Sequence, residues 1–209
     1  MPVTAKICGL STAATLDAAL AGGASHVGFV SFPASPRHLD PAALAGLAAR
    51  VPARVQTVAV LVDPDDALVA AVAPHVTALQ LHKTDPARVA ALRAHGRELW
   101  AAVPVKTRAD LDAARAFRGA ADRILYDAKT PDAAALPGGM GLRFDWALLD
   151  GFAHPLPWAL SGGLDAANVA EAASRTGARL VDVSSGVESA PGVKDVDKIA
   201  AFLQAVARL

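Results

Sequence analysis

Short apolar runs rich in valine and isoleucine alternate with alanine- and leucine-rich stretches from one end of the chain to the other. Such runs are typical of buried strands, whereas apolar residues that recur every three to four positions are typical of helices. The pattern predicts strands at Val3–Cys8, His26–Ser31, Val55–Val62, Ala78–His82, Leu99–Val103, Arg123–Asp127, Trp158–Ser161 and Leu180–Ser184. It predicts helices at Thr12–Ala21, Pro41–Arg50, Asp66–Ala73, Pro86–Ala94, Ala109–Phe117, Asp165–Thr176 and Val196–Leu209.

Strands that are each followed by a helix indicate a parallel sheet covered by helices. Eight units in 209 residues give about 26 residues each, which is tight for a (β/α)8 TIM barrel of roughly 250 residues. A doubly wound open sheet is the competing fold. Because the units share one composition and no linker separates them, we favour closure and expect an α/β fold with a single (β/α)8-barrel domain over residues 1–209. The long loop Ala128–Arg143 is expected to be functional.

Composition narrows the function classes. Twenty basic residues balance twenty acidic ones, which argues against nucleic-acid or polybasic membrane binding. A single cysteine allows no internal disulfide and gives no sign of an oxidising compartment. No apolar run is long enough to span a membrane, and Asp17 and Gly22-Gly23 make the N-terminal stretch a poor secretory signal. We expect a soluble cytoplasmic protein with no nucleic-acid or membrane partner.

In a barrel of this kind the active site lies at the carboxyl ends of the strands, so polar residues there face one cavity. The candidates are Lys6, Cys8, Arg37, Gln80, His82, Asp127, Asp182 and Ser184. The six histidines have no paired spacing with one another or with Cys8, so we expect no metal site.

Cys8 ends the first strand within Lys6-Ile7-Cys8-Gly9-Leu10. Most free cysteines act as small buried apolar residues, and that interpretation stays open. The alternative is a reactive thiol, because Lys6 lies two residues earlier and should share its face of the strand. A cation in that position would lower the pKa of the thiol.

Asp127 and Arg37 each allow two interpretations. Asp127, at the end of the sixth strand, either begins an Asx turn or holds over the barrel mouth a carboxyl group whose pKa burial raises enough for general-acid chemistry. Arg37 follows Ser35-Pro36 and is either an exposed surface residue or a planar fork for a substrate carboxylate. For Asp182, between two valines of the eighth strand, we favour a pair with Lys6 of the first strand.

Three glycine-bearing turns complete the candidates. They are Gly138-Gly139-Met140-Gly141, Ser161-Gly162-Gly163-Leu164 and Ser184-Ser185-Gly186. The last two follow strands seven and eight, where barrels often bind phosphate through backbone N–H groups. Phosphate binding is therefore the interpretation that we favour over simple turns.

Taken together, these residues resemble the phosphoribosylanthranilate isomerase family of tryptophan biosynthesis. The matching segments run across nearly the whole chain, and their order and spacing are highly specific. They are Lys6-Ile7-Cys8-Gly9-Leu10, Gly28-Phe29-Val30, Ser35-Pro36-Arg37, Gln80-Leu81-His82, Asp127, Gly138-Gly139-Met140-Gly141, Phe144-Asp145-Trp146, Ser161-Gly162-Gly163-Leu164, Val181 to Glu188, Pro191-Gly192 and Lys194-Asp195.

The resemblance implies an Amadori rearrangement of N-(5-phosphoribosyl)anthranilate without cofactor or metal. Asp127 matches the general acid that opens the ribose ring, Cys8 matches the general base that removes the C2′ proton, and Arg37 matches the residue that holds the anthranilate carboxylate. The expected phosphate cradle comprises Gly141, Gly162, Gly163, Ser185 and Gly186, and we expect His82 and Asp182 to contact the substrate as well. The expected partner is this small phosphosugar substrate, bound by a monomer or a homodimer.

The chain departs from the family pattern in four places. Lys83 stands where glycine is common, Met140 where a small polar residue is common, Ser31 for phenylalanine and Ser161 for alanine. Two other functions compete: a related isomerase of histidine biosynthesis, whose family has aspartate where Cys8 stands, and a non-catalytic phosphate-binding barrel in which Cys8 and Asp127 are merely structural.

Overall fold

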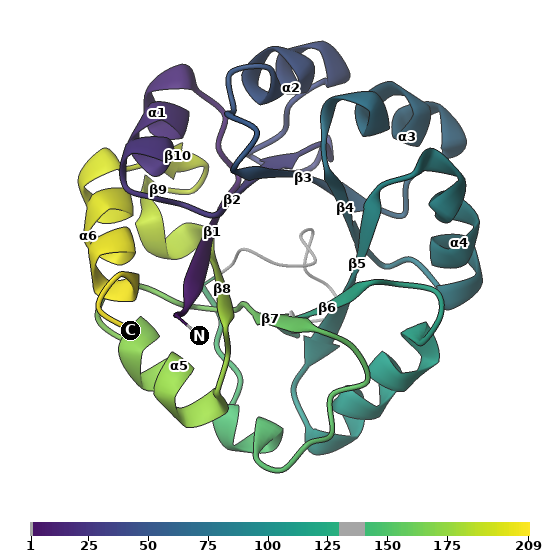
Figure 1. Cartoon of the computed structure of the whole chain (residues 1–209), viewed down its shortest axis with the longest axis vertical. Helices are drawn as coiled ribbons and strands as arrows, with labels where there is room; N and C mark the ends of the chain where they lie inside the picture. The colour runs from purple at the N-terminus through teal and green to yellow at the C-terminus, as the bar shows by residue number, and fades with distance from the viewer. Residues whose placement is uncertain (1, 130–140) are drawn as a thin grey trace.

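In the computed structural model, which describes residues 2–129 and 141–209, eight parallel strands close into a barrel surrounded by helices (Figure 1). Each strand pairs with its neighbour in the chain, and β8 pairs with β1 to complete the ring. The strands are β1 (Thr4–Cys8), β2 (His26–Val30), β3 (Gln56–Val62), β4 (Ala78–His82), β5 (Glu98–Val105), β6 (Arg123–Ala128), β7 (Trp158–Leu160) and β8 (Leu180–Val183). The TIM-barrel prediction is confirmed and the open sheet is excluded.

Helices follow the strands at most of the predicted positions. The α-helices are α1 (Ala13–Ala21), α2 (Pro41–Ala48), α3 (Asp66–Val72), α4 (Pro86–Ala91), α5 (Val169–Thr176) and α6 (Val196–Val206). The 3-10 helices are η1 (Ala73–His75), η2 (Leu92–His95), η3 (Arg108–Phe117), η4 (Trp146–Leu149) and η5 (Ser185–Val187). A short antiparallel hairpin of β9 (Glu188–Ala190) and β10 (Val193–Lys194) lies outside the ring of barrel strands (Figure 1) and was not predicted.

Two predicted helices differ from the structure for local reasons. The segment predicted as an α-helix before Phe117 is the 3-10 helix η3, and its buried residues Leu111, Ala114 and Phe117 recur every third position, which suits three residues per turn. α5 begins at Val169 rather than Asp165, because the Asp165 carboxylate accepts the backbone N–H groups of the residues that follow it and forms an Asx turn.

The inside of the barrel has an apolar layer beneath a polar one. Val58, Ala78, Trp100, Leu125, Ala159 and Leu180 form a separate buried cluster contributed by β3 to β8. Side chains two positions apart on a strand share a face, so the residues two positions further along three of these strands, Gln80, Asp127 and Asp182, also face the interior. All three are buried. The apolar layer therefore closes the barrel below a set of polar groups.

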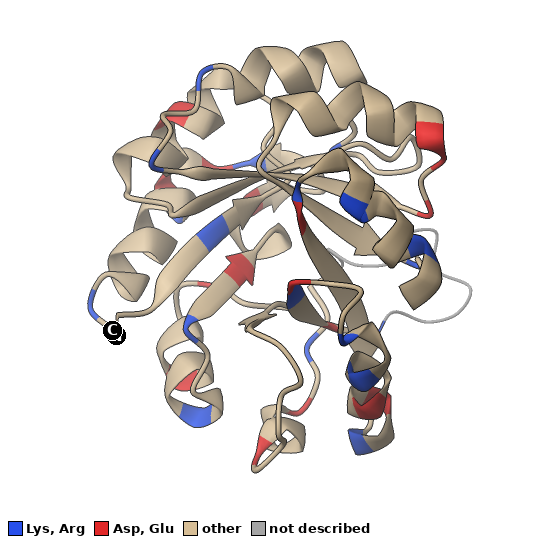
Figure 2. Cartoon of the chain, turned by 45° about the vertical axis from the view of Figure 1, so that its right-hand side comes forward, with Lys and Arg blue, Asp and Glu red and all other residues tan. Residues whose placement is uncertain are grey.

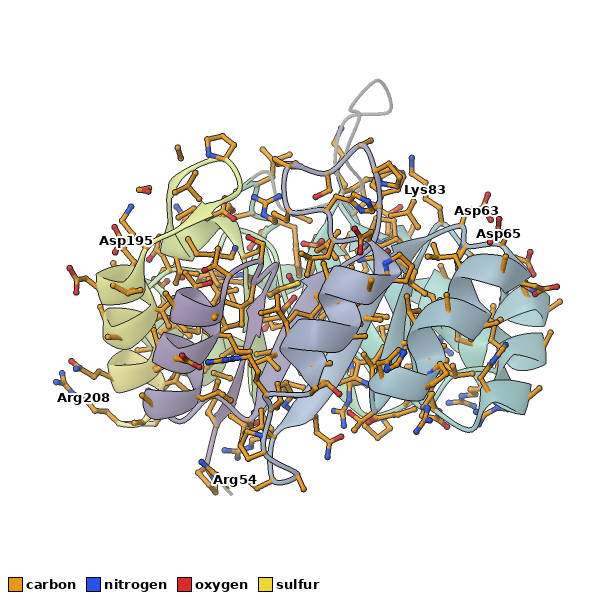
Figure 3. All side chains as sticks on the ribbon, turned by 90° about the horizontal axis from the view of Figure 1, so that it is seen from above. Arg54, Asp63, Asp65, Lys83, Asp195 and Arg208 are labelled. Carbon is orange, nitrogen blue, oxygen red and sulfur yellow. The ribbon has the colours of Figure 1, made fainter. Side chains whose placement is uncertain are left out.

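The two ends of the barrel carry different loops. Figure 3 places Asp63 and Lys83 at one end and Arg54 and Arg208 at the other. Asp63 and Lys83 directly follow β3 and β4, so theirs is the end to which the strand carboxyl termini point. Most charged positions lie on the helices and loops rather than on the strands (Figure 2). No helix in the described part of the chain is long and apolar enough to cross a membrane.

Candidate active site

A pocket of about 770 Å³, its open mouth included, lies at the carboxyl ends of the barrel strands. Two of the strand-end candidates, Gln80 and Ser184, line it, whereas Lys6 is not part of the lining. Nine of the ten residues expected to catalyse the reaction or contact the substrate line it as well: Cys8, Arg37, His82, Asp127, Gly141, Gly162, Gly163, Asp182 and Ser185. The tenth, Gly186, is not part of this lining; its backbone packs against the carbonyl group of Leu164, where an added Cβ would clash. The structure thus brings residues of β1, β4, β6 and β8, and of the loops after β2, β6, β7 and β8, into one cavity. The carboxyl ends of the strands are where the active sites of such barrels lie.

Lys6 and Asp182 form a buried ion pair at the seam between β1 and β8. The register of the two strands sets the residues side by side, and Lys6 Nζ donates to Asp182 Oδ1 at 2.9 Å. Their side chains are 0% and 4% exposed. The predicted pairing is confirmed.

Cys8 shares this corner with the Lys6 ammonium. A Cβ added to Gly28 on β2 would lie 3.1 Å from Cys8 Sγ and 3.1 Å from Lys6 Nζ. Both groups therefore pack over Gly28, and a side chain at that position would crowd them. The glycine leaves the space that the thiol and the ammonium occupy.

Burial raises the pKa of the Cys8 thiol more than the positive charge of Lys6 lowers it, and the negative charge of Asp182 adds to the increase. The net pKa of Cys8 is therefore raised, a result that the sequence did not predict because it does not show how deeply the thiol is buried. Lys6 still acts in the expected sense, because it stabilises the thiolate against the cost of burial.

Asp127 lies inside the pocket with only 7% of its surface exposed. Burial, together with the negative charge of Asp182, raises the pKa of its carboxyl group to about 7. The backbone N–H of Ala128 donates to Oδ1 at 2.9 Å and limits that rise. Near neutral pH a substantial fraction of Asp127 therefore carries a proton, which suits a group that gives one away.

Arg37 is buried rather than exposed, so its interpretation as a surface residue is wrong. Its Nε and Nη2 both donate to the carboxylate of Glu188 at 2.7 Å. Glu188 also accepts from Lys194 Nζ at 2.6 Å. Sequence reasoning gave no role to Glu188 or Lys194, although both lie in segments that resemble the family.

His82 and Gln80 form a polar pair on β4. His82 Nε2 lies 2.9 Å from Gln80 Nε2, and burial lowers the pKa of His82 to about 4. The imidazole is therefore neutral at neutral pH; with this amide orientation it accepts from Gln80 and carries its proton on Nδ1. Gln80 Oε1 is buried without a hydrogen-bond partner among the described residues.

The glycine turns after β6, β7 and β8 meet at one side of the pocket. Gly162 has φ +93°, and a Cβ there would lie 2.8 Å from the backbone nitrogen of Ala128 and 3.2 Å from Asp127 Oδ1. A Cβ on Gly141 would lie 3.6 Å from Ser185 Oγ. Closely packed backbone of this kind can present N–H groups to an anion. The predicted Gly138-Gly139-Met140 lies outside the described residues.

Three departures from the family pattern have local explanations. Lys83 has φ 52°, a left-handed conformation that glycine adopts without strain, so glycine is the natural residue there. Ser31 Oγ donates to the carbonyl of Leu39 at 2.9 Å. Ser161 Oγ donates to Asp182 Oδ2 at 3.3 Å and adds a partner to the buried carboxylate. Within residues 2–129 and 141–209 there is no group of three or more histidine, cysteine, aspartate or glutamate residues that could hold a metal ion.

Comparison with known proteins agrees with this geometry. Residues 5–205 match the family described as N-(5'phosphoribosyl)anthranilate (PRA) isomerase. The chain belongs to the PRA isomerase family. It is therefore an isomerase of tryptophan biosynthesis.

Individual relatives span the whole chain. The N-(5'-phosphoribosyl)anthranilate isomerase of Zymomonas mobilis subsp. pomaceae is 54% identical, with 99% of each chain covered, and that of Rhodospirillum centenum is 52% identical, with 100% of each chain covered. Among solved structures, the PRA isomerase of Thermotoga maritima is 33% identical with a TM-score of 0.85, covering 99% of this chain and 100% of that one. A further PRA isomerase structure, 31% identical with a TM-score of 0.82 and the same coverage, holds reduced 1-(o-carboxyphenylamino)-1-deoxyribulose 5-phosphate.

Proposed function

We propose that the pocket rearranges N-(5′-phosphoribosyl)anthranilate by acid–base catalysis, with Asp127 as the general acid and Cys8 as the general base. The observation that carries this proposal is that both groups reach one pocket, where the Asp127 carboxyl has a pKa of about 7 and the Cys8 thiol packs with an ammonium over Gly28. A carboxyl group that is partly protonated at neutral pH can donate a proton. A thiol beside a cation can accept one in its thiolate form.

The reaction then proceeds in two proton transfers. Asp127 gives its proton to the ribose ring oxygen, the C1′–O bond breaks, and the nitrogen lone pair forms the C1′=N bond of a protonated Schiff base. The Cys8 thiolate removes the C2′ proton, and the electrons of the C2′–H bond form the C1′=C2′ bond of an enolamine while the nitrogen regains its lone pair. The enolamine tautomerises to the 1-deoxyribulose 5-phosphate product.

The other predicted site residues are assigned to substrate binding. Arg37 holds the anthranilate carboxylate, and the turns at Gly141, Gly162-Gly163 and Ser185-Gly186 hold the phosphate through backbone N–H groups. The neutral His82 and the buried Asp182 contact the sugar. The relative that holds a reduced carboxyphenylamino-deoxyribulose phosphate supports a ligand with these two anionic ends.

We further propose that residues 1–209 form one catalytic domain and that it acts in the cytoplasm. A Thermotoga maritima relative is described as dimeric. For this chain, monomer and homodimer both stay predictions, and light scattering of the purified protein decides between them.

The proposed roles are tested by Cys8→Ser and Asp127→Asn. Each change removes a group that transfers a proton in the transition state, so kcat should fall about 10²–10⁴-fold while KM changes little. The substrate is assayed beside the aminoaldose substrate of the histidine-pathway isomerase, with wild-type protein as the control. Full activity in either variant removes that residue from the mechanism, and turnover of the histidine-pathway substrate alone would overturn the proposed reaction.

A further inference from the structure

The side chain of Arg37 is held by a carboxylate that belongs to a separate hairpin. Nε and Nη2 of the guanidinium donate to the two oxygens of Glu188 at 2.7 Å each, and the side chains are 5% and 4% exposed. A two-pronged contact of this kind fixes the plane of the guanidinium as well as its position. Its orientation in the pocket is therefore set by Glu188 on β9.

Lys194 on β10 completes a buried group of three charges, which we call the hairpin charge group: Arg37, Glu188 and Lys194. Lys194 Nζ donates to Glu188 Oε1 at 2.6 Å, and its side chain is 1% exposed. It also donates to the backbone oxygen of Ser184 at 2.9 Å, at the end of β8. The lysine thus fastens the hairpin to the rim of the pocket.

The turn of the hairpin packs directly on the loop that carries Arg37. A Cβ on Gly192 would lie 2.7 Å from the carbonyl oxygen of Pro36, the residue before Arg37. The backbone N–H of Gly192 donates to Glu188 Oε2 at 3.2 Å. The carboxylate of Glu188 is therefore held from several directions, and it holds Arg37 in turn.

The charges of the hairpin charge group show why a lysine accompanies the pair. An Arg37–Glu188 pair alone has no net charge, so it gives an anionic substrate group no net attraction. Lys194 restores one net positive charge, since two cations then surround one carboxylate. A buried site with a net positive charge attracts a carboxylate. Because the guanidinium is already fixed, little conformational freedom is lost when the carboxylate binds.

We infer that Glu188 and Lys194 are positioning and specificity residues for the ring carboxylate of the substrate, acting through Arg37. This inference rests on the proposed function of the pocket. Glu188 sets the orientation of the guanidinium, and Lys194 supplies the charge that keeps the site attractive to an anion. The β9–β10 hairpin is thus a recognition element that distinguishes a carboxylated aromatic amine from an uncarboxylated one.

The test compares two ligands in each variant: reduced 1-(o-carboxyphenylamino)-1-deoxyribulose 5-phosphate and the same compound without the ring carboxyl group. The measured quantity is the ratio of their two dissociation constants, which does not change when part of the protein is unfolded. Lys194→Met and Glu188→Gln should each lower the preference for the carboxylated ligand about tenfold, a change that corresponds to about 1.4 kcal/mol. Lys194→Arg should retain most of the preference.

Two controls separate positioning from a general effect. In an Arg37→Ala background, Glu188→Gln should no longer lower the preference for the carboxylated ligand, because Glu188 acts on the ligand through Arg37. Lys198→Met removes an exposed cation that contacts the hairpin only through the Glu188 backbone oxygen at 2.7 Å, and the ratio should stay within about twofold of wild type.

The outcomes are distinct. An unchanged ratio in both Lys194→Met and Glu188→Gln, with normal turnover by the wild-type protein, overturns the inference and leaves the proposed function standing. Equal losses in Lys194→Met and Lys198→Met also overturn it. Wild-type protein that fails to turn over the substrate overturns the proposed function itself.

Discussion

Replacing Lys6 by methionine should show what the buried ion pair contributes to both stability and catalysis. The change removes the ammonium but keeps a long unbranched side chain, so packing is largely preserved. Among the described residues, Asp182, which is 3% exposed, would keep only the 3.3 Å hydrogen bond from Ser161 Oγ. Removing one member of a buried pair typically costs about 3–5 kcal/mol, which is a large share of a typical total of about 5–15 kcal/mol.

The double variant Lys6→Met, Asp182→Leu separates the loss of the ion pair itself from the cost of leaving Asp182 buried without its partner. Because it leaves no unpaired buried charge, its free energy of unfolding should lie closer to wild type than that of Lys6→Met alone. Urea unfolding at pH 7, followed by tryptophan fluorescence, measures all four corners of the cycle. Burial lowers the pKa of Lys6, but attraction by Asp182 and Cys8 outweighs it and raises the pKa above its usual 10.5. The stability that the Lys6 charge contributes is therefore fully present at pH 7 and is lost as pH rises from 10.5 through the raised pKa.

Activity provides the second measurement. Without the Lys6 charge the pKa of Cys8 should rise further, so kcat/KM at pH 7 should fall in both Lys6→Met and the double variant, whatever their stability. The reasoning would be refuted if the free energy of unfolding of Lys6→Met lay within about 1 kcal/mol of the wild-type value and the variant kept full activity.

Two further predictions concern the pH dependence of activity and the packing around Cys8. The productive form has a protonated Asp127, whose pKa is about 7, and a deprotonated Cys8, whose pKa is raised. As Cys8 loses its proton, kcat/KM should rise with pH; it should level off above about pH 7, where Asp127 loses its proton, and fall only above the pKa of Cys8. In Asp127→Asn the residual kcat/KM should instead keep rising through pH 7, and a decline from pH 6 to 8 in wild type would contradict the assignment. Gly28→Ala should lower kcat about tenfold or more by displacing Cys8 and Lys6, whereas Gly46→Ala, whose Cβ would meet nothing within 4 Å, should not; equal kcat values in the two variants would contradict the steric argument.

The sequence predicted the barrel well because its strands are buried on both faces. All eight strands lie within two residues of the predicted bounds, and their order follows from the rule that neighbours in the chain are neighbours in the barrel. Cys8, Asp127 and Asp182 could be placed at the pocket for the same reason, since each stands at or near the carboxyl end of a strand. Strand ends are thus a strong guide to position.

The sequence was a weaker guide to the environment of these residues. The net pKa of Cys8 depends on how deeply the thiol is buried, which a pattern of residue types does not give. Glu188 and Lys194 lie on strands of three and two residues, too short for a periodic signal. Their link to Arg37 joins residues 151 positions apart, and such contacts follow from tertiary packing alone.

The Lys6–Asp182 ion pair also makes the surroundings of Cys8 depend on the last strand of the barrel. Lys6 and Asp182 are 176 positions apart, and Cys8 obtains its cationic neighbour inside a barrel that only the last strand can close. A ribosome-bound chain or a fragment that lacks β8 would hold Cys8 and Lys6 without Asp182, the partner of that lysine. Such a piece would bind and turn over substrate poorly even if its other strands had paired. During refolding, activity should therefore recover only when the barrel has closed.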